Sequence, residues 1–202
     1  MPNHPTDLRQ QCRQRRRQLT PQQQIEHAGA ASRIALRTRW LQRPKRIGLF
    51  LPQDGELDTH FLLEALLKRG HRLYLPVLQT LRGRPMAFAP YTAASILTPN
   101  RFRIHEPITP HGDHINAHQL DVLFAPLTCF DHAGHRLGMG GGFYDRSLAF
   151  KQWFPNVRPV VIGWAHECQY QPELPVEPWD QPLDALITET RLYEFRNIQA
   201  PT

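Results

Sequence analysis

Apolar residues follow two different spacings along the chain, and the change of spacing separates helical from extended segments. Five apolar residues between positions 25 and 35 recur at intervals of three and four, which predicts a helix. Its start is marked at Thr20-Pro21-Gln22-Gln23, with a threonine N-cap, proline at the first helical position and glutamine three residues after the cap. This helix is predicted to end near Trp40. Leu8 and Cys12 share one face of an earlier predicted helix, residues 7–18.

Short continuous apolar runs have the length and composition of buried strands. Five such strands are predicted, at residues 46–51, 72–78, 121–125, 159–164 and 184–188, with a weaker one at 86–91 after a turn at 82–85. Asp58 or Thr59 can cap a helix that runs to Lys68 and stops at Gly70. Another helix is predicted from residue 142 to about 153. Residues 1–5, 98–118, 126–135 and 165–183 are expected to be irregular.

The alternation of strands and helices predicts the fold class. A strand–helix–strand unit at residues 46–78 implies parallel pairing with a crossover helix. We therefore predict one α/β domain over residues 1–202, with a mainly parallel sheet between two helical layers, Rossmann-like, and an N-terminal helical arm at 1–42. Ligands of such sheets bind beyond the carboxyl ends of the strands. Glu56 follows the first strand and is a candidate there.

Charge and cysteine content narrow the class of protein. The formal net charge is +6, with an arginine cluster at positions 9, 13, 15, 16 and 17. This cluster suits either nucleic-acid binding or a solvated helix face, and we favour the solvated face. Three scattered cysteines predict reduced thiols in the cytoplasm, without a disulfide framework. No apolar stretch is long enough for a transmembrane helix.

A glycine-rich motif at residues 136–146, RLGMGGGFYDR, carries the strongest chemical signal. Four of the twelve glycines lie within five positions, at 138 and 140–142. Exposed backbone amides before a helix start are suited to phosphate, and Arg136 and Arg146 can neutralise it. Asp145 can hold a cation. The motif lacks the glycine pattern of dinucleotide folds and the Gly-Lys-Ser/Thr ending of a P-loop. A tight turn between strand and helix is the simpler interpretation of the glycines alone.

The motif and five other segments together resemble the 5-formyltetrahydrofolate cyclo-ligase family. DVLFAPLTCFD precedes the glycine motif. LFLPQDGELDT (49–59), RLYLPVL (72–78), RIHEP (103–107) and LPVEPWDQPLDALIT (174–188) appear in the family's order. Members of this family convert 5-formyltetrahydrofolate and ATP into 5,10-methenyltetrahydrofolate, ADP and phosphate, with Mg²⁺. The resemblance implies a ligase of one-carbon metabolism, and we expect a monomer without nucleic-acid or membrane partners.

The resemblance also implies site residues by motif position. Residues expected to contact ATP are Arg9, Arg136, Leu137, Gly138, Met139, Gly140, Gly141, Gly142, Phe143 and Tyr144. Residues expected to contact the folate are Leu51, Glu56, Met139, Gly140, Gly141, Gly142 and Phe143. Tyr144 and Asp145 are the expected catalytic residues, and Asp145 and Asp180 the expected magnesium ligands, a hard-oxygen pair that suits this ion.

This chain departs from the family at three positions. Pro5 stands where the family commonly has a lysine, and Met139 and Gly141 stand in a loop where many relatives have a cation. Phosphate binding here is expected to depend more on amides and flanking arginines. Two alternatives use the same residues: a nucleic-acid-binding protein acting through the arginine cluster, and a related α/β enzyme acting on a sugar phosphate or a CoA ester.

Overall fold

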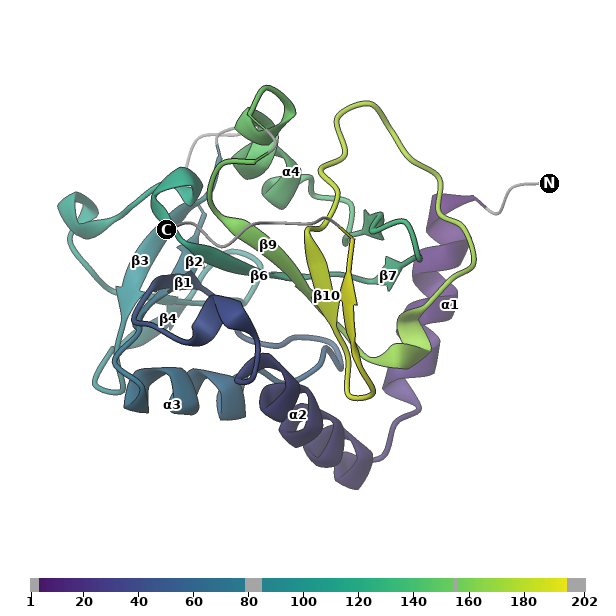
Figure 1. Cartoon of the computed structure of the whole chain (residues 1–202), viewed down its shortest axis with the longest axis horizontal. Coiled ribbons are helices and arrows are strands. Elements are labelled where there is room, and N and C mark those ends of the chain that lie inside the picture. The colour runs from purple at the N-terminus through teal and green to yellow at the C-terminus, as the bar shows by residue number, and fades with distance from the viewer. Residues whose placement is uncertain (1–3, 79–84, 155, 196–202) are drawn as a thin grey trace.

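A central sheet organises the chain (Figure 1). The computed structural model describes residues 4–78, 85–154 and 156–195. Within them, seven strands form one sheet in the order β11-β10-β9-β6-β1-β2-β3. The five inner strands are parallel: β1 (Arg46–Gly48), β2 (Arg72–Val77), β6 (Val122–Pro126), β9 (Val160–Trp164) and β10 (Ala185–Ile187). The two edge strands, β3 (Ala87–Tyr91) and β11 (Leu192–Glu194), are antiparallel to their neighbours. The predicted α/β class with a mainly parallel sheet is confirmed.

Helices cover both faces of the sheet, which gives three layers. Strand β6 alternates between the two hydrophobic clusters: Val122 and Phe124 belong to one, Leu123 and Ala125 to the other. The first cluster includes residues of α2 (Pro21–Ala35), η1 (Arg39–Leu41) and α3 (His60–Lys68). The second includes residues of η3 (Ala117–Gln119), α4 (Phe143–Leu148) and η4 (Ala149–Gln152). Each buried strand is therefore apolar on both sides, as its continuous apolar run predicted.

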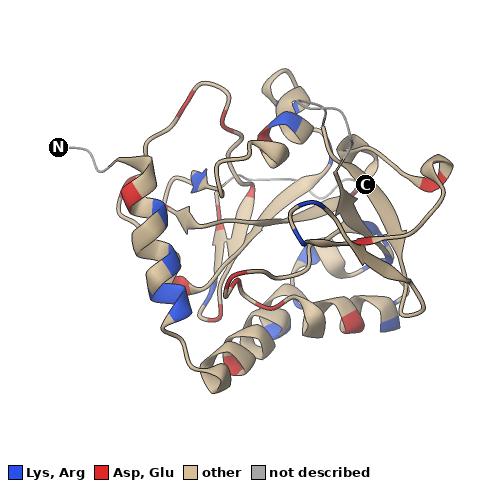
Figure 2. Cartoon of the chain, turned by 180° about the vertical axis from the view of Figure 1, so that it is seen from behind, with Lys and Arg blue, Asp and Glu red and all other residues tan. Residues whose placement is uncertain are grey.

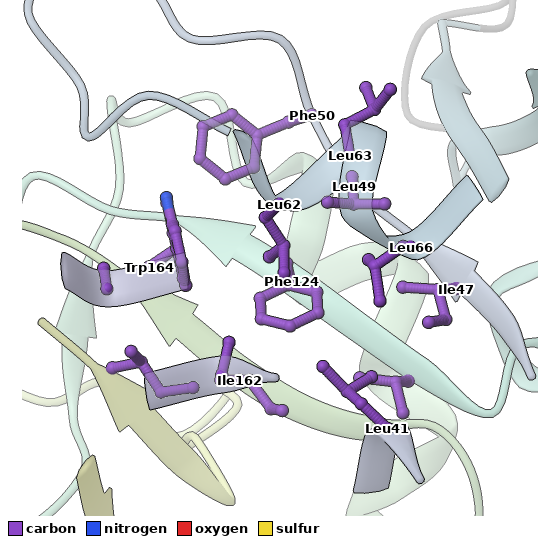
Figure 3. Packing of buried hydrophobic residues seen from close by; sticks show 14 of the residues in the cluster. Leu41, Ile47, Leu49, Phe50, Leu62, Leu63, Leu66, Phe124, Ile162 and Trp164 are labelled. Atoms are coloured by element: carbon purple, nitrogen blue, oxygen red, sulfur yellow. The ribbon is translucent and has the colours of Figure 1, made fainter. Parts of the chain in front are cut away.

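The first cluster is built around large side chains of neighbouring strands. Figure 3 shows Phe124, Ile162 and Trp164 beneath Leu62 and Leu66 of α3. The rings of Phe124 and Trp164 meet edge to face with centroids 5.5 Å apart, a favourable arrangement for aromatic quadrupoles. This packing fixes α3 over β1 and β6, and so fixes the segment between β1 and α3.

The N-terminal helix α1 (Pro5–Arg17) packs away from the two main clusters. Its apolar face buries Leu8 and Cys12 against Cys129, Leu137 and Leu174. It lies against the small hairpin of β7 (Cys129–Phe130) and β8 (Arg136–Leu137) and against η5 (Glu167–Gln169). Because β8 leads directly into the glycine motif, α1 is anchored beside that motif.

Local sequence signals explain several element boundaries. The predicted capping box of α2 is present: Thr20 Oγ1 accepts from the Gln23 amide at 3.2 Å, and the Thr20 amide donates to Gln23 Oε1 at 2.9 Å. At α3, Asp58 Oδ1 accepts from the His60 amide at 2.7 Å. Thr59 instead donates its hydroxyl to the Phe50 carbonyl at 2.7 Å. Asp58 therefore supplies the side-chain bond at this helix start.

Some predicted boundaries are wrong. Helix α2 ends at Ala35, where the Thr38 hydroxyl donates to the Ala35 carbonyl at 2.8 Å and competes with further helix. Helix α4 ends at Leu148 and continues only as η4. Segments expected to be irregular hold β4 (Leu97–Pro99), β5 (His105–Pro107), η2 (His111–Asp113), η3, η5 and β7. These short pairings arise from long-range contacts that local composition does not signal. Residues 1–3 of the segment 1–5 predicted to be irregular, and residues 82–84 of the predicted turn at 82–85, lie outside the described residues.

Candidate active site

The two motif-bearing segments follow adjacent strands at the point where the sheet reverses its winding. Numbered along the chain, the five parallel strands lie in the spatial order 2-1-3-4-5. The reversal therefore falls between β1 and β6, which pair through Ile47 and Val122. Ligands of doubly wound sheets bind in the crevice beyond this point. We call residues 52–56, after β1, the acidic loop, and residues 138–142, after β6 and the β7–β8 hairpin, the glycine loop.

The glycine loop has backbone conformations that favour glycine. Gly140 has φ of 91° and Gly142 has φ of 61°, both in the left-handed region. Gly142 is the N-cap of α4. Arg9 of α1 donates from Nε to the Gly138 carbonyl at 2.8 Å. The structure thus brings Arg9 to the glycine loop, and the expected contact of Arg9 with ATP stays a prediction.

Three buried polar atoms beside the glycine loop have no hydrogen-bond partner among the described residues. They are Arg136 Nε, Arg146 Nε and the Tyr144 hydroxyl. Arg136 is held by Asp145, whose Oδ1 lies 2.6 Å from Arg136 Nη2. A buried donor without a partner is unfavourable in the protein alone. The arrangement is therefore suited to a ligand that accepts several hydrogen bonds, such as a phosphate chain.

Glu56 faces this group from the acidic loop. Its side chain is only 10% exposed, and burial raises the pKa of this carboxyl to about 7, against the opposing charge of Arg16. Glu56 Oε2 accepts from the Gln53 amide at 3.0 Å. Burial also raises the pKa of the Tyr144 hydroxyl, and the nearby Glu56 charge raises it further. The effect of the Glu56 charge on the pKa of Tyr144 indicates that the two residues lie near each other.

The acidic loop is held by the arginine cluster of α1. Asp54 Oδ2 lies 2.7 Å from Arg13 Nε and 3.1 Å from Arg16 Nη2. Arg17 Nε donates to Asp54 Oδ1 at 2.6 Å, and Arg16 Nε donates to the Asp54 carbonyl at 2.9 Å. Burial alone would raise the pKa of Asp54, but the bonds from Arg13, Arg17 and Arg16 lower it below its ordinary value. Asp54 itself adopts φ of 53°.

These contacts correct the expectation that the arginine cluster is a solvated face. Figure 2 shows several basic positions, in blue, along α1, yet Arg16 is fully buried, with a side-chain exposure of 0%. Arg16 also donates to the Leu127 carbonyl at 3.3 Å, and Arg15 to the Tyr170 carbonyl at 3.2 Å. Much of the cluster's charge is thus used inside the protein, which leaves less of it for a polyanion.

Asp145 and Asp180 lie on adjoining segments. Asp145 Oδ1 accepts weakly from the Gln181 amide at 3.5 Å, in addition to its pairing with Arg136. Asp180 Oδ2 accepts from the Glu177 amide at 2.9 Å. Among the described residues, no donor hydrogen-bonds the second oxygen of Asp145. Each carboxylate thus keeps oxygen capacity for a hard cation.

The predicted site residues lie mainly on the glycine loop, the acidic loop and α1. Leu51 is half-buried against the main hydrophobic cluster, before the acidic loop, and Met139 is exposed on the glycine loop. Sequence reasoning missed Asp54 and Arg16. A usable signal existed, because Arg9, Arg13 and Arg16 recur at spacings of four and three and so share one helix face.

Comparison with known proteins assigns the family. The model of the 5-formyltetrahydrofolate cyclo-ligase family matches residues 3–189. The chain is 43% identical over 183 residues to the 5-formyltetrahydrofolate cyclo-ligase of Escherichia coli K12, covering 91% of this chain and 99% of that protein. The Haemophilus influenzae cyclo-ligase is 36% identical over 181 residues, covering 89% and 95%.

A solved structure supports the same assignment. The NMR structure of Aquifex aeolicus 5,10-methenyltetrahydrofolate synthetase superposes with a TM-score of 0.80 at 26% identity, covering 98% of this chain and 96% of that one. No helix among the described residues is long and apolar enough to cross a membrane. The motif string, the site at the winding reversal and these similarities agree: the chain belongs to the 5-formyltetrahydrofolate cyclo-ligase family.

Proposed function

We propose that this protein converts 5-formyltetrahydrofolate and ATP into 5,10-methenyltetrahydrofolate, ADP and phosphate, with Mg²⁺ as the metal ion. One observation supports it above the others. Unpartnered buried groups of Arg136, Tyr144 and Arg146 surround the glycine loop, and the buried carboxylate of Glu56 lies opposite. Hydrogen-bond donors for an anion and a hydrogen-bond acceptor for a heterocycle thus lie near the same edge of the sheet.

The glycine loop is the proposed nucleotide end of the site. Its amides and the guanidinium groups of Arg9, Arg136 and Arg146 would neutralise the phosphate chain. Arg136 Nη2 is already held by Asp145, so its orientation is fixed before ATP arrives. Such preorganised charge is the main contribution that a protein makes to phosphoryl transfer. The lysine missing at Pro5 is offset by this guanidinium set in our proposal.

The acidic loop is the proposed folate end. The pterin ring presents adjacent N–H donors, and the ionised carboxylate of Glu56 can accept two of them at once. Leu51 would supply apolar contact for the ring system. With a pKa of about 7 in the free protein, the Glu56 carboxyl is partly protonated near neutral pH. The N–H donors of the pterin would favour its ionised form.

The chemistry follows from the weak reactivity of a formamide. Its oxygen attacks the terminal phosphorus of ATP, the bond to the bridging oxygen breaks, and ADP leaves. The resulting imidate phosphate is attacked at the formyl carbon by the neighbouring anilino nitrogen, which closes the five-membered ring and expels phosphate. The Tyr144 hydroxyl stays protonated because its pKa is raised. It can therefore donate a hydrogen bond to oxygen atoms that gain charge during transfer.

The carboxylates fit a magnesium ion on chemical grounds. Asp145 and Asp180 offer hard oxygens on adjoining segments, and magnesium usually binds one or two carboxylates together with phosphates and waters. The ion would neutralise charge on the nucleotide phosphates. Asp145 also has a role that does not need the ion, because its carboxylate orients the Arg136 guanidinium.

A direct assay tests the proposal. Purified protein, 5-formyltetrahydrofolate, ATP and Mg²⁺ are mixed, and the near-ultraviolet absorbance of the methenyl product is followed. Omission of ATP or of Mg²⁺ should abolish the change, and Glu56→Gln should slow it. Absence of product with folded protein would refute the proposal. We also propose a cytoplasmic location, supported by three free cysteines.

A further inference from the structure

A second polar cluster lies outside the proposed ligase site. It combines His27 of α2, His166 immediately after β9, and Glu189 after β10. One ligand atom from each lies within 4.8 Å of the others. In the described part of the chain, it is the one group of three metal-ligating side chains with this spacing. Neither the glycine loop nor the acidic loop contributes a side chain to it.

Three potential ligand atoms face each other in this cluster, and the Gln169 amide also donates to the His166 side chain. His27 Nδ1 lies 2.9 Å from His166 Nδ1 and 3.5 Å from Glu189 Oε1. A neutral His27 ring carries at most one proton on Nδ1, so it can bond well to only one of these two acceptors. If that proton is on Nε2 instead, the Nδ1 lone pair points toward a carboxylate. A single cation among the three atoms satisfies all of them.

The three residues differ in burial. His166 is fully buried, whereas His27 and Glu189 are part-buried. The positive charge of Arg16 would oppose a cation, but Arg16 is paired with Asp54 at 3.1 Å.

Neighbouring backbone groups orient the side chains of this cluster, as hydrogen bonds orient the ligands in known metal sites. Glu189 Oε2 accepts from the Glu167 amide at 3.0 Å, which leaves Oε1 directed at His27. His166 Nε2 has no hydrogen-bond partner of good geometry and lies close to the backbone of Gly55. A histidine bound through Nδ1 carries its proton on Nε2 and commonly donates it to a backbone carbonyl. A small ring movement would supply that bond.

We propose that His27, His166 and Glu189 bind a divalent transition-metal ion of the zinc type. Two imidazole nitrogens and one carboxylate oxygen suit Zn²⁺, which takes three protein ligands and one water in open sites. Zn–N bonds of about 2.0 Å in a tetrahedron place two nitrogens about 3.3 Å apart, so the rings need separate only slightly from 2.9 Å. His27 has a side-chain exposure of 21%, which gives the ion a route from solvent. The bound ion would join α2 to the ends of β9 and β10.

Zinc competition tests the site directly. The purified chain is freed of metal with a chelator and titrated with Zn²⁺ against a chromophoric chelator. We expect one site, weakened by at least about 10–100-fold in His27→Gln and in Glu189→Gln, since even outer contacts change metal affinity by that factor. His60→Gln is the matched control, because His60 also pairs with a carboxylate, Asp58 at 2.6 Å, but has no second histidine.

Cobalt supplies an independent readout. Co²⁺ in place of Zn²⁺ should give intense visible bands of a tetrahedral site in wild type and His60→Gln, and lose them in His27→Gln. The melting temperatures of the metal-free variants confirm that each is folded. Equal Zn²⁺ affinity in wild type, His27→Gln and Glu189→Gln would overturn the proposal and leave the cluster as a histidine–histidine hydrogen bond. Because neither folate nor ATP is present, this result is independent of the ligase proposal.

Discussion

The two loops of the proposed active site are held in opposite ways. The acidic loop is clamped: three arginines of α1 converge on Asp54, and the loop carries a buried carboxylate. The glycine loop is contacted by Arg9, which donates to the Gly138 carbonyl. Beside this loop, Arg136 Nε, Arg146 Nε and the Tyr144 hydroxyl have no hydrogen-bond partner among the described residues. The proposed folate end is thus preformed, whereas the proposed phosphate end has donors that ATP could use.

This difference shows which interactions stabilise each loop. Ion pairs with a fully buried Arg16 hold the half-buried acidic loop against α1. The glycine loop depends on dihedral angles that only glycine adopts easily. Substitutions should therefore affect stability at the first loop and nucleotide use at the second.

The largest effect is expected for Asp54→Asn. It leaves buried Arg16 with only the more distant carboxylate of Glu56, 4.0 Å away, and should lower the free energy of unfolding at pH 7 by about 3 kcal/mol, measured by chemical denaturation. Because the folded-state pKa of Asp54 is lowered, its contribution is present above about pH 4 and is lost as the pH falls further. Glu194→Gln is the control: it removes an exposed ion pair with Arg39 and should cost less than about 1 kcal/mol. Equal losses of stability in Asp54→Asn and Glu194→Gln would contradict the inference that the arginines of α1 hold the acidic loop through Asp54.

Glu56→Gln should separate stability from binding. The folded-state pKa is raised from 4.5 to about 7, so the wild-type carboxyl stabilises the ligand-free protein below about pH 4.5 and loses this contribution as the pH rises through 7. At pH 8 the glutamine variant should be more stable by up to about 3 kcal/mol, and at pH 4 the gain should vanish. Thermal or chemical unfolding at both pH values measures this. A pH-independent difference would show that Glu56 ionisation is not the cause.

The same residue predicts a pH profile for folate binding. Wild-type affinity should rise about tenfold per pH unit up to pH 7 and then level off, since binding needs the ionised carboxylate. Glu56→Gln should bind folate more weakly by about 1.5–3 kcal/mol at pH 8, with a flatter profile and nearly unchanged ATP binding. Calorimetric titration with each ligand is the measurement. Equal loss of both ligands would assign Glu56 a folding role.

Asp145→Asn and Asp180→Asn test the phosphate end. Each should raise the KM for Mg-ATP about tenfold or more, close to 1.4 kcal/mol, while folate affinity changes little. Asp145→Asn should also lower the melting temperature, because Asp145 pairs with the buried Arg136, whereas Asp180→Asn should leave it nearly unchanged. The double variant should show less than the sum of the two effects, because both residues serve one ion. If both single variants keep the wild-type dependence on magnesium, Asp145 and Asp180 do not bind the ion.

Gly140→Ala is expected to have the smallest effect on folding. An added Cβ meets no atom within 4 Å, so only the φ of 91° resists it, at a cost of about 1 kcal/mol. The loop can relax, and weaker ATP binding should then be the main result. Gly112→Ala also meets no atom within 4 Å and lacks a positive φ. It serves as the control and should change neither stability nor KM for ATP.

The sequence by itself determined the elements with local signals. Local sequence was enough to identify three features: the capping box at Thr20, the apolar runs of the parallel strands and the glycine motif. Helix caps, strand burial and turns depend on residues that lie close together in the sequence. The motif string also indicated the family. From these, the α/β class and the position of Glu56 beyond β1 followed.

Only the tertiary structure decided what the charged residues do. Arg16 and Asp54 are 38 residues apart in sequence, and Arg9 and Gly138 are 129 apart, so their pairing depends on the docking of α1 against the β7–β8 hairpin. His27, His166 and Glu189 likewise meet only because α2 packs beside the ends of β9 and β10. Burial, charge pairing and pKa depend on neighbours brought together by folding, and a spacing pattern along one chain does not contain them.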